Sequence, residues 1–395
     1  MKVGIVAYRY DYYPYIRNIV GIVPGVEYRK ARDLYAWVNA AAHTLNRIVQ
    51  REVIPTFDLN NQFCDFNLNQ VDLVHLFNGI SYCRSPWVST FETALPRFRS
   101  SLQITRTATP RIKKGSKLHQ AIQALAGPNC KQIIAISDCT AKMQHELLSN
   151  FSDYADIIDQ KMIVMHPPQK LLISRFDEKQ IDLDGCIKFM MVGNAFFRKG
   201  GSEILATLKK LREQHQYALE LIVVSNLSPD RYVMTVTPDL VNKTRIILQE
   251  NHDWITYYPQ LPNNEVLDLM KKVHVGLLPT YADTYGYSVL EFQASGCPVI
   301  TTDVRSLPEI NDNDKGWIIN VPKNCLGEAI YDTEADRRAI SQAICEGLEA
   351  AIHSVFTDRS NIPVKANQSI LSIKTDHSLT RFSEAMKKIY LDAIS

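Results

Sequence analysis

Short apolar segments alternate with longer helical patterns along most of the chain, and this alternation limits the folds open to it. The apolar segments have the length of buried strands, and strands separated by helices are typical of βαβ units. The sequence therefore predicts an α/β fold built on parallel sheets. The predicted strands are Val3–Ala7, Leu73–Phe77, Ile133–Ile136, Phe189–Val192, Leu219–Val224, Val275–Leu278 and Val299–Thr302. The predicted helices include Lys30–Val49, Thr140–Phe151, Ser202–His215, Asn264–Lys272 and Glu334–Ser354.

This strand and helix rhythm runs twice, which predicts two domains in a chain of 395 residues. A polar stretch separates the two sets, and the second set begins at Ile187. We therefore expect an N-terminal Rossmann-like domain over residues 1–172 and a C-terminal domain over residues 187–375. Residues 376–395 place their apolar side chains on one helical face. They are expected to form a helix that packs on its own domain or crosses back to the first.

Charge is distributed unevenly between the two halves. Lys and Arg exceed Asp and Glu by seven up to Leu172, and acids exceed bases by five after it. Such asymmetry indicates two domains with different partners. A basic first half favours an anionic acceptor, and it makes the N-terminal domain a candidate for peripheral contact with a membrane. Nucleic acid is not an expected partner.

Several classes of protein are disfavoured. The eight cysteines have no CxxC spacing, which argues against a common zinc site and against a disulfide framework. No stretch approaches the roughly 20 apolar residues of a membrane helix, and the N-terminus is predicted to be a strand, not a signal peptide. No G-x-G-x-x-G follows a strand, so a Rossmann oxidoreductase is the weaker alternative. We expect a cytoplasmic protein.

Residues 280–303 carry the most informative pattern of the chain. Asp283 and Glu291 lie eight positions apart, and Tyr285-Gly286-Tyr287 lies between them. A helix is predicted to begin at this turn and to end at Gly296. Backbone N–H groups at a helix start can hold phosphate, and flanking carboxylates can hold sugar hydroxyls. An acidic loop that runs into a helix start therefore makes a compact candidate binding site.

This pattern resembles the donor site of the retaining glycosyltransferases of family 4, which have the GT-B fold. Tyr285-Gly286 fills the aromatic-Gly position of their motif, and Gly296-Cys297-Pro298-Val299 fills its small-Gly-x-Pro-Val end. The first acid of the motif is usually Glu, and here it is the shorter Asp283. The resemblance covers most of residues 187–310 and implies two Rossmann-like domains facing across a cleft.

The resemblance also implies roles for individual residues. Arg198 and Lys199 would face the donor diphosphate, Asp283 would contact the donor sugar, and Glu291 would bind the ribose. The stretch Lys188–Gly201 resembles the first strand of the donor domain and its following turn, where many members place an Arg and this chain has Asn194. The remaining implied donor-binding positions are Gly193, Leu261, Tyr285, Gly286, Tyr287, Ser288 and Val289. Outside the family context, the Arg198-Lys199 pair and Glu291 read as ordinary surface charges.

The acceptor half resembles the family only in outline. Glu92 stands where many members have a His near the reacting sugar, and it could equally be a carboxylate at a strand end. His75 reads as a core histidine. Tyr residues 8, 10, 12, 13 and 15 could form a platform for a sugar or pack inside a loop. A run without acids contains Arg99, Arg106, Arg111, Lys113, Lys114 and Lys117. This run is either a solvated face or a site for an anionic acceptor.

Taken together, the resemblance implies transfer of a hexosyl unit from a nucleotide sugar, with a UDP- or GDP-sugar favoured, to an acceptor hydroxyl with retention of configuration. The acceptor would be a glycan, a lipid-linked sugar or a small molecule. Two D-x-D triples, Asp182–Asp184 and Asp312–Asp314, read as turns, so we expect metal-independent transfer and no cofactor. The departures at Asp283, Asn194 and Glu92 leave a second possibility, a nucleotide-sugar-binding or partner subunit with little or no activity.

Overall fold

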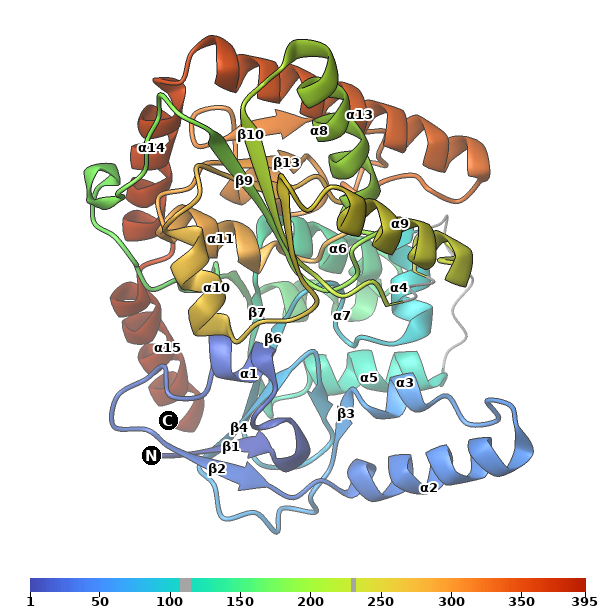
Figure 1. The fold of residues 1–395 in the computed structure, drawn as a ribbon. Helices are drawn as coiled ribbons and strands as arrows, with labels where there is room; N and C mark the ends of the chain where they lie inside the picture. The colour runs from blue at the N-terminus through green and yellow to red at the C-terminus, as the bar shows by residue number, and fades with distance from the viewer. Residues whose placement is uncertain (107–114, 229–231) are drawn as a thin grey trace. The chain divides into compact units, whose positions relative to one another are not determined.

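The chain folds into two compact units in the computed structural model, which describes residues 1–106, 115–228 and 232–395 (Figure 1). Unit 1 comprises Met1–Pro168 and Ser378–Ser395, and unit 2 comprises Gln169–His377. Each unit has a six-stranded parallel sheet with helices around it. The prediction of an α/β fold with two parallel sheets is therefore confirmed.

The sheet of unit 1 has the strand order β2-β1-β4-β6-β7-β8, and every pairing in it is parallel. Its strands are β1 (Lys2–Val6), β2 (Glu27–Ala31), β4 (Leu73–Phe77), β6 (Trp87–Phe91), β7 (Cys130–Ala135) and β8 (Met162–Val164). A separate pair joins β3 (Gln62–Phe63) to β5 (Ile80–Ser81). Because the chain leaves β1 toward β2 on one side and toward β4 on the other, the topology switches between β1 and β4.

Helices cover both faces of the unit 1 sheet. They are η1 (Ala7–Arg9), α1 (Tyr13–Asn18), α2 (Leu34–Val49), α3 (Thr56–Leu59), α4 (Arg99–Arg106), α5 (Lys117–Ala126), α6 (Asp138–Leu148), α7 (Ser152–Asp159) and α15 (Leu379–Ile394). One core packs α5, α6 and α7 on the sheet, and the other packs α1 and α15 on it. Within the described ranges, none of the helices is both long and apolar enough to cross a membrane.

The C-terminal helix α15 belongs to unit 1, although the chain reaches it through unit 2. Phe382, Met386 and Tyr390 are buried in one core with residues of the sheet, and α15 packs on β4 and β7. The Tyr390 hydroxyl also lies 2.7 Å from Nδ1 of His75 on β4. Figure 1 shows this helix, in dark red, beside the sheet of unit 1. The apolar face that the sequence predicts for this helix thus completes one core of unit 1.

One predicted helix is wrong at its start. Lys30–Val49 was expected to be one helical segment, but Glu27–Ala31 forms β2, and the helix begins only after Asp33. The β2 sequence is polar because the strand lies at the sheet edge, where it pairs with β1 alone and needs no apolar alternation. The Asp33 carboxylate accepts the Tyr35 N–H at 3.0 Å, and this cap fixes the true helix start.

The sheet of unit 2 has the order β11-β10-β9-β12-β13-β14, again entirely parallel. Its strands are β9 (Ile187–Val192), β10 (Leu219–Val224), β11 (Ile255–Tyr258), β12 (Val275–Leu278), β13 (Val299–Thr302) and β14 (Trp317–Ile319). The topology switches between β9 and β12. In open α/β sheets ligands bind at the carboxyl ends of the strands at this switch.

The helices of unit 2 surround this sheet. They are η2 (Phe176–Glu178), α8 (Gly201–His215), α9 (Pro238–Glu250), α10 (Asn263–Met270), α11 (Tyr287–Ala294), α12 (Leu307–Ile310), α13 (Glu334–Thr357) and α14 (Asn361–Thr375). The buried helix α11 packs closely on β12: a Cβ on Gly276 would lie 2.7 Å from the Phe292 ring. Gly276 therefore sets how near the helix that carries Glu291 comes to the sheet.

The packing of α15 on unit 1 predicts a large loss of stability for Met386→Ala. Met386 is fully buried, so we expect the free energy of unfolding to fall by about 2–4 kcal/mol, since truncation leaves a cavity. Leu391→Ala, at a half-exposed position of the same helix, should cost less than about 1 kcal/mol. Urea unfolding followed by circular dichroism measures both. Equal effects of the two substitutions would contradict the packing described for α15.

Candidate active site

The loop after β9 brings two cations to the switch point of the unit 2 sheet. Arg198 and Lys199 lie at its end, and both are half-buried. Gly193 has φ +131°, and a Cβ there would lie 2.8 Å from Cε of Lys199. The Lys199 side chain therefore runs over Gly193, and the positive φ at Gly193 favours glycine there. Gly200 in turn approaches Pro279, whose carbonyl oxygen would lie 2.2 Å from a Cβ at that position.

The loop after β12 is shaped by Asp283. Its Oδ1 accepts the backbone N–H groups of Tyr285 at 3.2 Å and Gly286 at 3.0 Å, so the carboxylate forms the turn that starts α11. Gly286 has φ +91° and stands at the helix N-cap. The helix begins at Tyr287 and ends before Gly296, as the sequence predicts.

Asp283 and Lys199 join the two loops in one ion pair. Their Oδ2 and Nζ atoms are 2.8 Å apart, and the side chains are only 14% and 12% exposed. Burial opposes the ionisation of Asp283, but the Lys199 ammonium and the two N–H groups outweigh it and lower its pKa below the usual value. Three of the roughly four lone-pair positions of the carboxylate are thus used within the protein. One lone-pair position on Oδ2 is left over by these three contacts.

Arg198 is held by the same two loops. Its Nη1 donates to the Ala282 carbonyl at 2.9 Å, and its own carbonyl accepts the Tyr281 N–H at 2.9 Å. Its guanidinium carbon also lies 5.7 Å from the centre of the Tyr232 ring. The guanidinium is therefore positioned between a backbone carbonyl and an aromatic ring.

Sequence reasoning missed the residues that hold Tyr232. Arg305, after β13, donates from Nη2 to the Tyr232 hydroxyl at 3.1 Å and pairs with Glu328 at 2.5 Å. Both charged side chains are 6% exposed. Burial opposes the charge on Arg305, but Glu328 overcomes this and raises its pKa. The sequence offered one signal for Arg305, its place shortly after β13. Because β13 is the neighbour of β12, the loops after both strands lie at the same edge of the sheet.

Glu291 lies on the second turn of α11 and is 7% exposed. It is therefore no ordinary surface residue of a helix. Tyr285 and Val289 are fully buried, whereas Tyr287 and Ser288 are half-buried at the helix start. The Tyr285 and Tyr287 rings lie 5.3 Å apart. Among the aromatic and apolar positions of the motif, Tyr285 and Val289 thus build the core that holds α11 in place.

Asn194 and Leu261 lie at the neighbouring strand ends. Asn194 is exposed, and its Oδ1 accepts from Nδ2 of Asn226, which follows β10, at 3.0 Å. Leu261 is half-buried in the loop between β11 and α10. The structure thus places Gly193, Asn194, Arg198, Lys199, Asp283 and the start of α11 in the loops at the carboxyl edge of one sheet. Leu261 follows β11, the strand at one side of this sheet.

The two D-x-D triples are turns, as expected. Asp182 Oδ1 accepts the Asp184 N–H at 2.9 Å. Asp312 Oδ1 accepts the Asp314 and Lys315 N–H groups, each at 2.9 Å, and Asp312 also pairs with the Lys315 ammonium at 3.1 Å. These carboxylates close their own loops, and this local use explains the spacing of both triples.

Unit 1 has a pocket of about 670 Å³ at the switch between β1 and β4. Glu92, at the end of β6, lies in it and pairs with Arg97 at 2.9 Å. Asn78 donates to the same carboxylate at 3.2 Å, and its own Oδ1 accepts the Glu92 N–H at 3.0 Å. Glu92 is therefore a strand-end carboxylate that lines a pocket.

Three of the five N-terminal tyrosines, Tyr8, Tyr12 and Tyr15, line the same pocket. Burial raises the pKa of Tyr8 to about 12, so its phenol stays protonated at neutral pH. Tyr15 is buried, and its hydroxyl accepts the Phe77 N–H at 3.1 Å. Arg9 also lines the pocket, which gives it two guanidinium groups with Arg97.

His75 is a core residue and no part of this pocket. Its imidazole is fully buried between the hydroxyls of Tyr390 and Thr90, and burial lowers its pKa to about 3. Of the basic run in this unit, residues 107–114 lie outside the described residues, and Arg111, Lys113 and Lys114 are among them. The Arg99 side chain is exposed and pairs with Glu52 at 2.6 Å.

The buried pair predicts that Asp283→Asn lowers the free energy of unfolding by about 2–4 kcal/mol at pH 7, because Lys199 keeps its charge without a partner. Asp283 has a lowered pKa in the folded state, so its stabilisation is present above about pH 4 and is lost as the pH falls through the folded pKa. The difference between wild type and variant should therefore shrink toward pH 3. Urea unfolding at several pH values measures it.

A matched control for this prediction is Asp268→Asn, which breaks the exposed pair with Lys271. Exposed pairs contribute about 0–1 kcal/mol, so this variant should unfold nearly as wild type does. A cost for Asp283→Asn as small as that of the control, or one that grows on acidification, would show that the Asp283 pair does not stabilise the loops.

A comparison with known proteins finds a family model that matches most of unit 2. Residues 174–344 match the model of the family described as glycosyl transferases group 1. Glycogen synthase from Mycobacterium tuberculosis is 22% identical over 209 residues, which cover 53% of this chain and 43% of that protein. The chain thus spans less than half of the length of this curated relative.

Solved structures match over both units. A glycosyltransferase from Rickettsia africae has 14% identity and a TM-score of 0.55, covering 94% of this chain and 86% of that one. Anabaena HepE, solved in complex with UDP, has 11% identity and a TM-score of 0.54, covering 92% and 85%. At such identities these structures establish the fold alone. Residues 174–344 therefore form a glycosyl transferases group 1 domain, and the chain has the α/β architecture of the GT-B glycosyltransferases.

Proposed function

We propose that the protein is a retaining glycosyltransferase that moves a hexosyl unit from a nucleotide-diphosphate sugar to an acceptor hydroxyl without a metal ion. The observation that carries this proposal is the meeting of Lys199 with Asp283, beside Arg198, at the switch point of unit 2. HepE has been solved with UDP and with UDP-glucose, which supports a UDP-sugar as the first donor to test.

Stabilisation of the leaving group is the task of Arg198 and Lys199. A nucleoside diphosphate leaves with growing negative charge, and cations held in place beforehand stabilise that charge without reorganisation in the transition state. Lys199 is held by Asp283, and Arg198 by the Ala282 carbonyl and the Tyr232 ring. This fixed positive charge supports metal-independent transfer.

We assign recognition of the donor to Asp283, Glu291 and the backbone amides at the start of α11. The remaining lone pair of Asp283 would accept one sugar hydroxyl, and the buried Glu291 would accept the ribose hydroxyls. The Tyr287 and Ser288 amides at the start of α11 lie where phosphate or sugar oxygens are bound in helix N-terminal sites. Transfer with retention would pass the acceptor proton to the leaving diphosphate on the same face of the sugar.

The acceptor would bind in the pocket of unit 1. Its phenols and its carboxylate Glu92 can hydrogen-bond sugar hydroxyls, and Arg9 and Arg97 favour an acceptor that carries a phosphate or carboxylate. A glycan or a lipid-linked sugar of this chemistry would suit the site. Glu92 is paired with Arg97, so we assign it a role in acceptor binding and positioning.

Three departures from the usual pattern, at Asn194, Asp283 and Glu92, support a second candidate function, a subunit that binds nucleotide sugar without turnover. Glu92 stands where many members have a His, and it is paired with Arg97. Asn194 brings no cation to the loop after β9, and Asp283 has a single lone pair left. Binding without diphosphate release, in the presence of competent acceptors, would favour this candidate.

The test is a panel of UDP-, GDP- and ADP-hexoses with and without EDTA, read by thermal shift and by release of nucleoside diphosphate. We expect one donor to stabilise the protein and to be consumed slowly by water, with EDTA making no difference. Lys199→Met should reduce diphosphate release at least about 100-fold, because the variant loses charge stabilisation in the transition state. Glu291→Gln should weaken donor binding about tenfold or more.

Two exposed positions of unit 2 provide controls for these variants. Lys209→Met removes an exposed cation of α8, and Glu265→Gln removes an exposed carboxylate of α10. Both variants should bind the donor and release nucleoside diphosphate as wild type does. Unchanged turnover in Lys199→Met, or dependence on Mg²⁺ or Mn²⁺ after chelation, would refute the mechanism proposed for unit 2.

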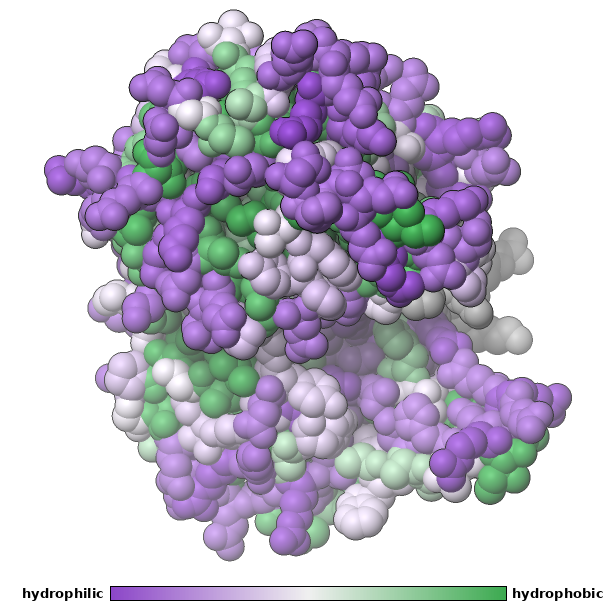
Figure 2. Space-filling view, in the orientation of Figure 1, coloured by the Kyte–Doolittle hydropathy of each residue, from purple (hydrophilic) through white to green (hydrophobic). Residues whose placement is uncertain are grey.

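A cytoplasmic protein with peripheral membrane contact is also part of this proposal, and α2 is the surface that supports it. Only Ala42 of its sixteen residues is buried, and Trp37 and Ile48 are 77% and 73% exposed. Figure 2 shows apolar side chains at the surface over this helix. Phe66 and Leu68 in a nearby loop are also strongly exposed, and four further apolar residues of α2 are about 40% exposed, namely Leu34, Val38, Leu45 and Val49.

Cations surround the α2 surface. Arg29, Lys30 and Arg32 line one groove together with Trp37 and Phe66, and Arg47 and Arg51 are exposed at the other end of the helix. An apolar helix face with Trp at the surface and flanking cations suits the interface of an anionic bilayer. The eight free cysteines agree with a reducing compartment.

Membrane contact predicts sedimentation with vesicles that contain anionic lipid, and weaker binding at high salt. Trp37→Ser combined with Ile48→Ser should lower the partition coefficient at least about tenfold, since both apolar side chains lose their place in the interface. Ile246→Ser, at a 51% exposed position of α9 in unit 2, is the matched control. Failure of the wild type to sediment with such vesicles would contradict membrane contact through α2.

A further inference from the structure

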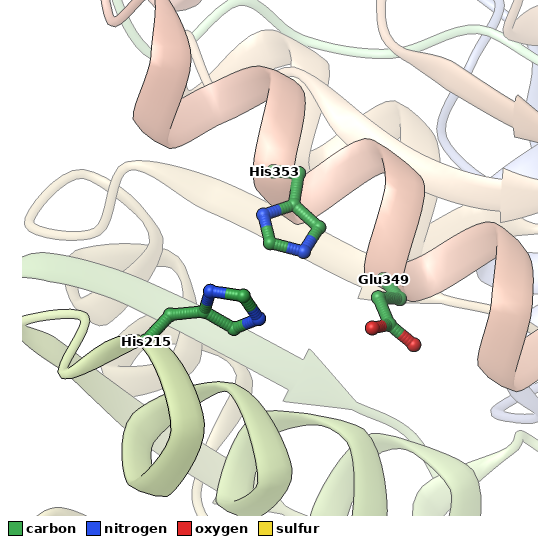
Figure 3. Close-up of side chains that lie close together, drawn as sticks. All are labelled: His215, Glu349 and His353. Atoms are coloured by element: carbon green, nitrogen blue, oxygen red, sulfur yellow. The ribbon is translucent and has the colours of Figure 1, made fainter.

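Two histidines and a glutamate meet in unit 2 outside the candidate donor site. His215 is the last residue of α8, and Glu349 and His353 lie one turn apart on α13. The two helices pack against each other. One ligand atom from each side chain lies within 4.8 Å of the other two. Figure 3 shows both imidazoles and the carboxylate directed toward one common space.

We propose that His215, Glu349 and His353 form a binding site for a single first-row transition-metal ion, with Zn²⁺ the natural occupant, that links α8 to α13. Two imidazoles and a carboxylate are a ligand set that zinc accepts, with water in the fourth position. This site is independent of the proposed sugar transfer, and it supplies no metal to that reaction.

The contact between Tyr217 and His353 supports this assignment. The Tyr217 hydroxyl lies 2.7 Å from Nδ1 of His353. A histidine that donates its Nδ1–H to such a partner presents Nε2 with its lone pair for a metal, and this arrangement is usual around zinc. Tyr217 is itself stacked on Phe356, with ring centres 4.0 Å apart and an interplanar angle of 4°. The orientation of His353 is therefore fixed by packing before any ion binds.

His215 is oriented by the same aromatic group. Its ring stacks on Tyr217 with a centroid distance of 5.4 Å and meets the His353 ring edge-on at 4.6 Å. It also lies at the C-terminal end of α8, where the exposed carbonyl groups favour a cation. One tyrosine thus places both imidazoles of the site.

The Glu349 carboxylate of this site is paired with a lysine, Lys210. Lys210 Nζ donates to both oxygens of Glu349, at 3.0 and 2.8 Å. The ammonium is 47% exposed, so it can turn into water when an ion takes its place. Ligand atoms around tetrahedral zinc lie about 3.3–3.5 Å apart. The ligand atoms of the site lie within 4.8 Å of one another, so binding of an ion would draw the exposed His215 and the half-buried Glu349 closer to His353.

The location suggests what the ion would do. Helix α8 begins at Gly201, directly after the loop that carries Arg198 and Lys199. A metal that ties the far end of α8 to α13 would stabilise the helix that anchors this loop. The expected effect is thermal stabilisation of unit 2.

The test uses the full-length protein without an affinity tag, stripped with EDTA and titrated with Zn²⁺ by calorimetry and thermal shift. We expect one ion per chain and a rise in Tm of about 4–8 °C at saturation, with no rise for Mg²⁺. His353→Ala and Glu349→Gln should each weaken Zn²⁺ binding about 10- to 100-fold or more, and Tyr217→Phe about tenfold.

Controls and a gain-of-affinity variant sharpen this test. Glu346→Gln, one turn earlier on α13, and His252→Ala, an exposed histidine elsewhere in unit 2, should bind Zn²⁺ as wild type does. Lys210→Met removes the competing ammonium and should tighten binding about two- to fivefold. Stoichiometric binding that survives His353→Ala, or no binding by wild type and Lys210→Met alike, would overturn the proposal. Both readouts are independent of transferase activity.

Discussion

The ion pair between Lys199 and Asp283 is the interaction on which the candidate donor site depends. It joins the loops after β9 and β12, the two strands between which the sheet reverses its order. Lys199 and Asp283 are 84 positions apart in the sequence. The sheet brings them together, and their low exposure makes the pair hard to exchange for water. Loss of either partner would leave a largely buried charge, which is costly.

Three glycines lie at close approaches in the loops around this pair. Gly193 has a backbone φ of +131°, which favours glycine, and Lys199 crosses it; Gly200 lies where the loop touches Pro279. Gly286 packs against Leu307 of α12, whose Cδ2 would lie 2.6 Å from a Cβ at that position. Each glycine therefore marks a close approach between loops of the same sheet edge. The conformations that place Arg198 and Asp283 are set by backbone contact as much as by their own hydrogen bonds.

The sequence predicted what local periodicity and turn chemistry determine. Strands β4, β9, β10, β12 and β13 were predicted closely, because buried parallel strands are short apolar runs. The start and end of α11 followed from Gly286 and Gly296. The edge strand β2 was missed, since a strand paired on one side needs no apolar pattern. The partner of Asp283 and the Glu328–Arg305–Tyr232 chain could not be predicted, because these contacts depend on which strands become neighbours.

Lys199 can remain paired with Asp283 and still donate hydrogen bonds to a ligand. Lys199 has three N–H donors, and its bond to Asp283 uses one of them. A diphosphate could therefore bind the remaining donors while the pair stays intact. Asp283 holds Lys199 and shapes the turn at Gly286, and these two contacts leave Oδ2 one position for the sugar hydroxyl that the proposed function requires. The same logic applies to Glu92, which holds Arg97 at the edge of the unit 1 pocket. In both units a carboxylate at a strand end fixes a cation where an anionic ligand would need it, so the charge is oriented before the ligand arrives.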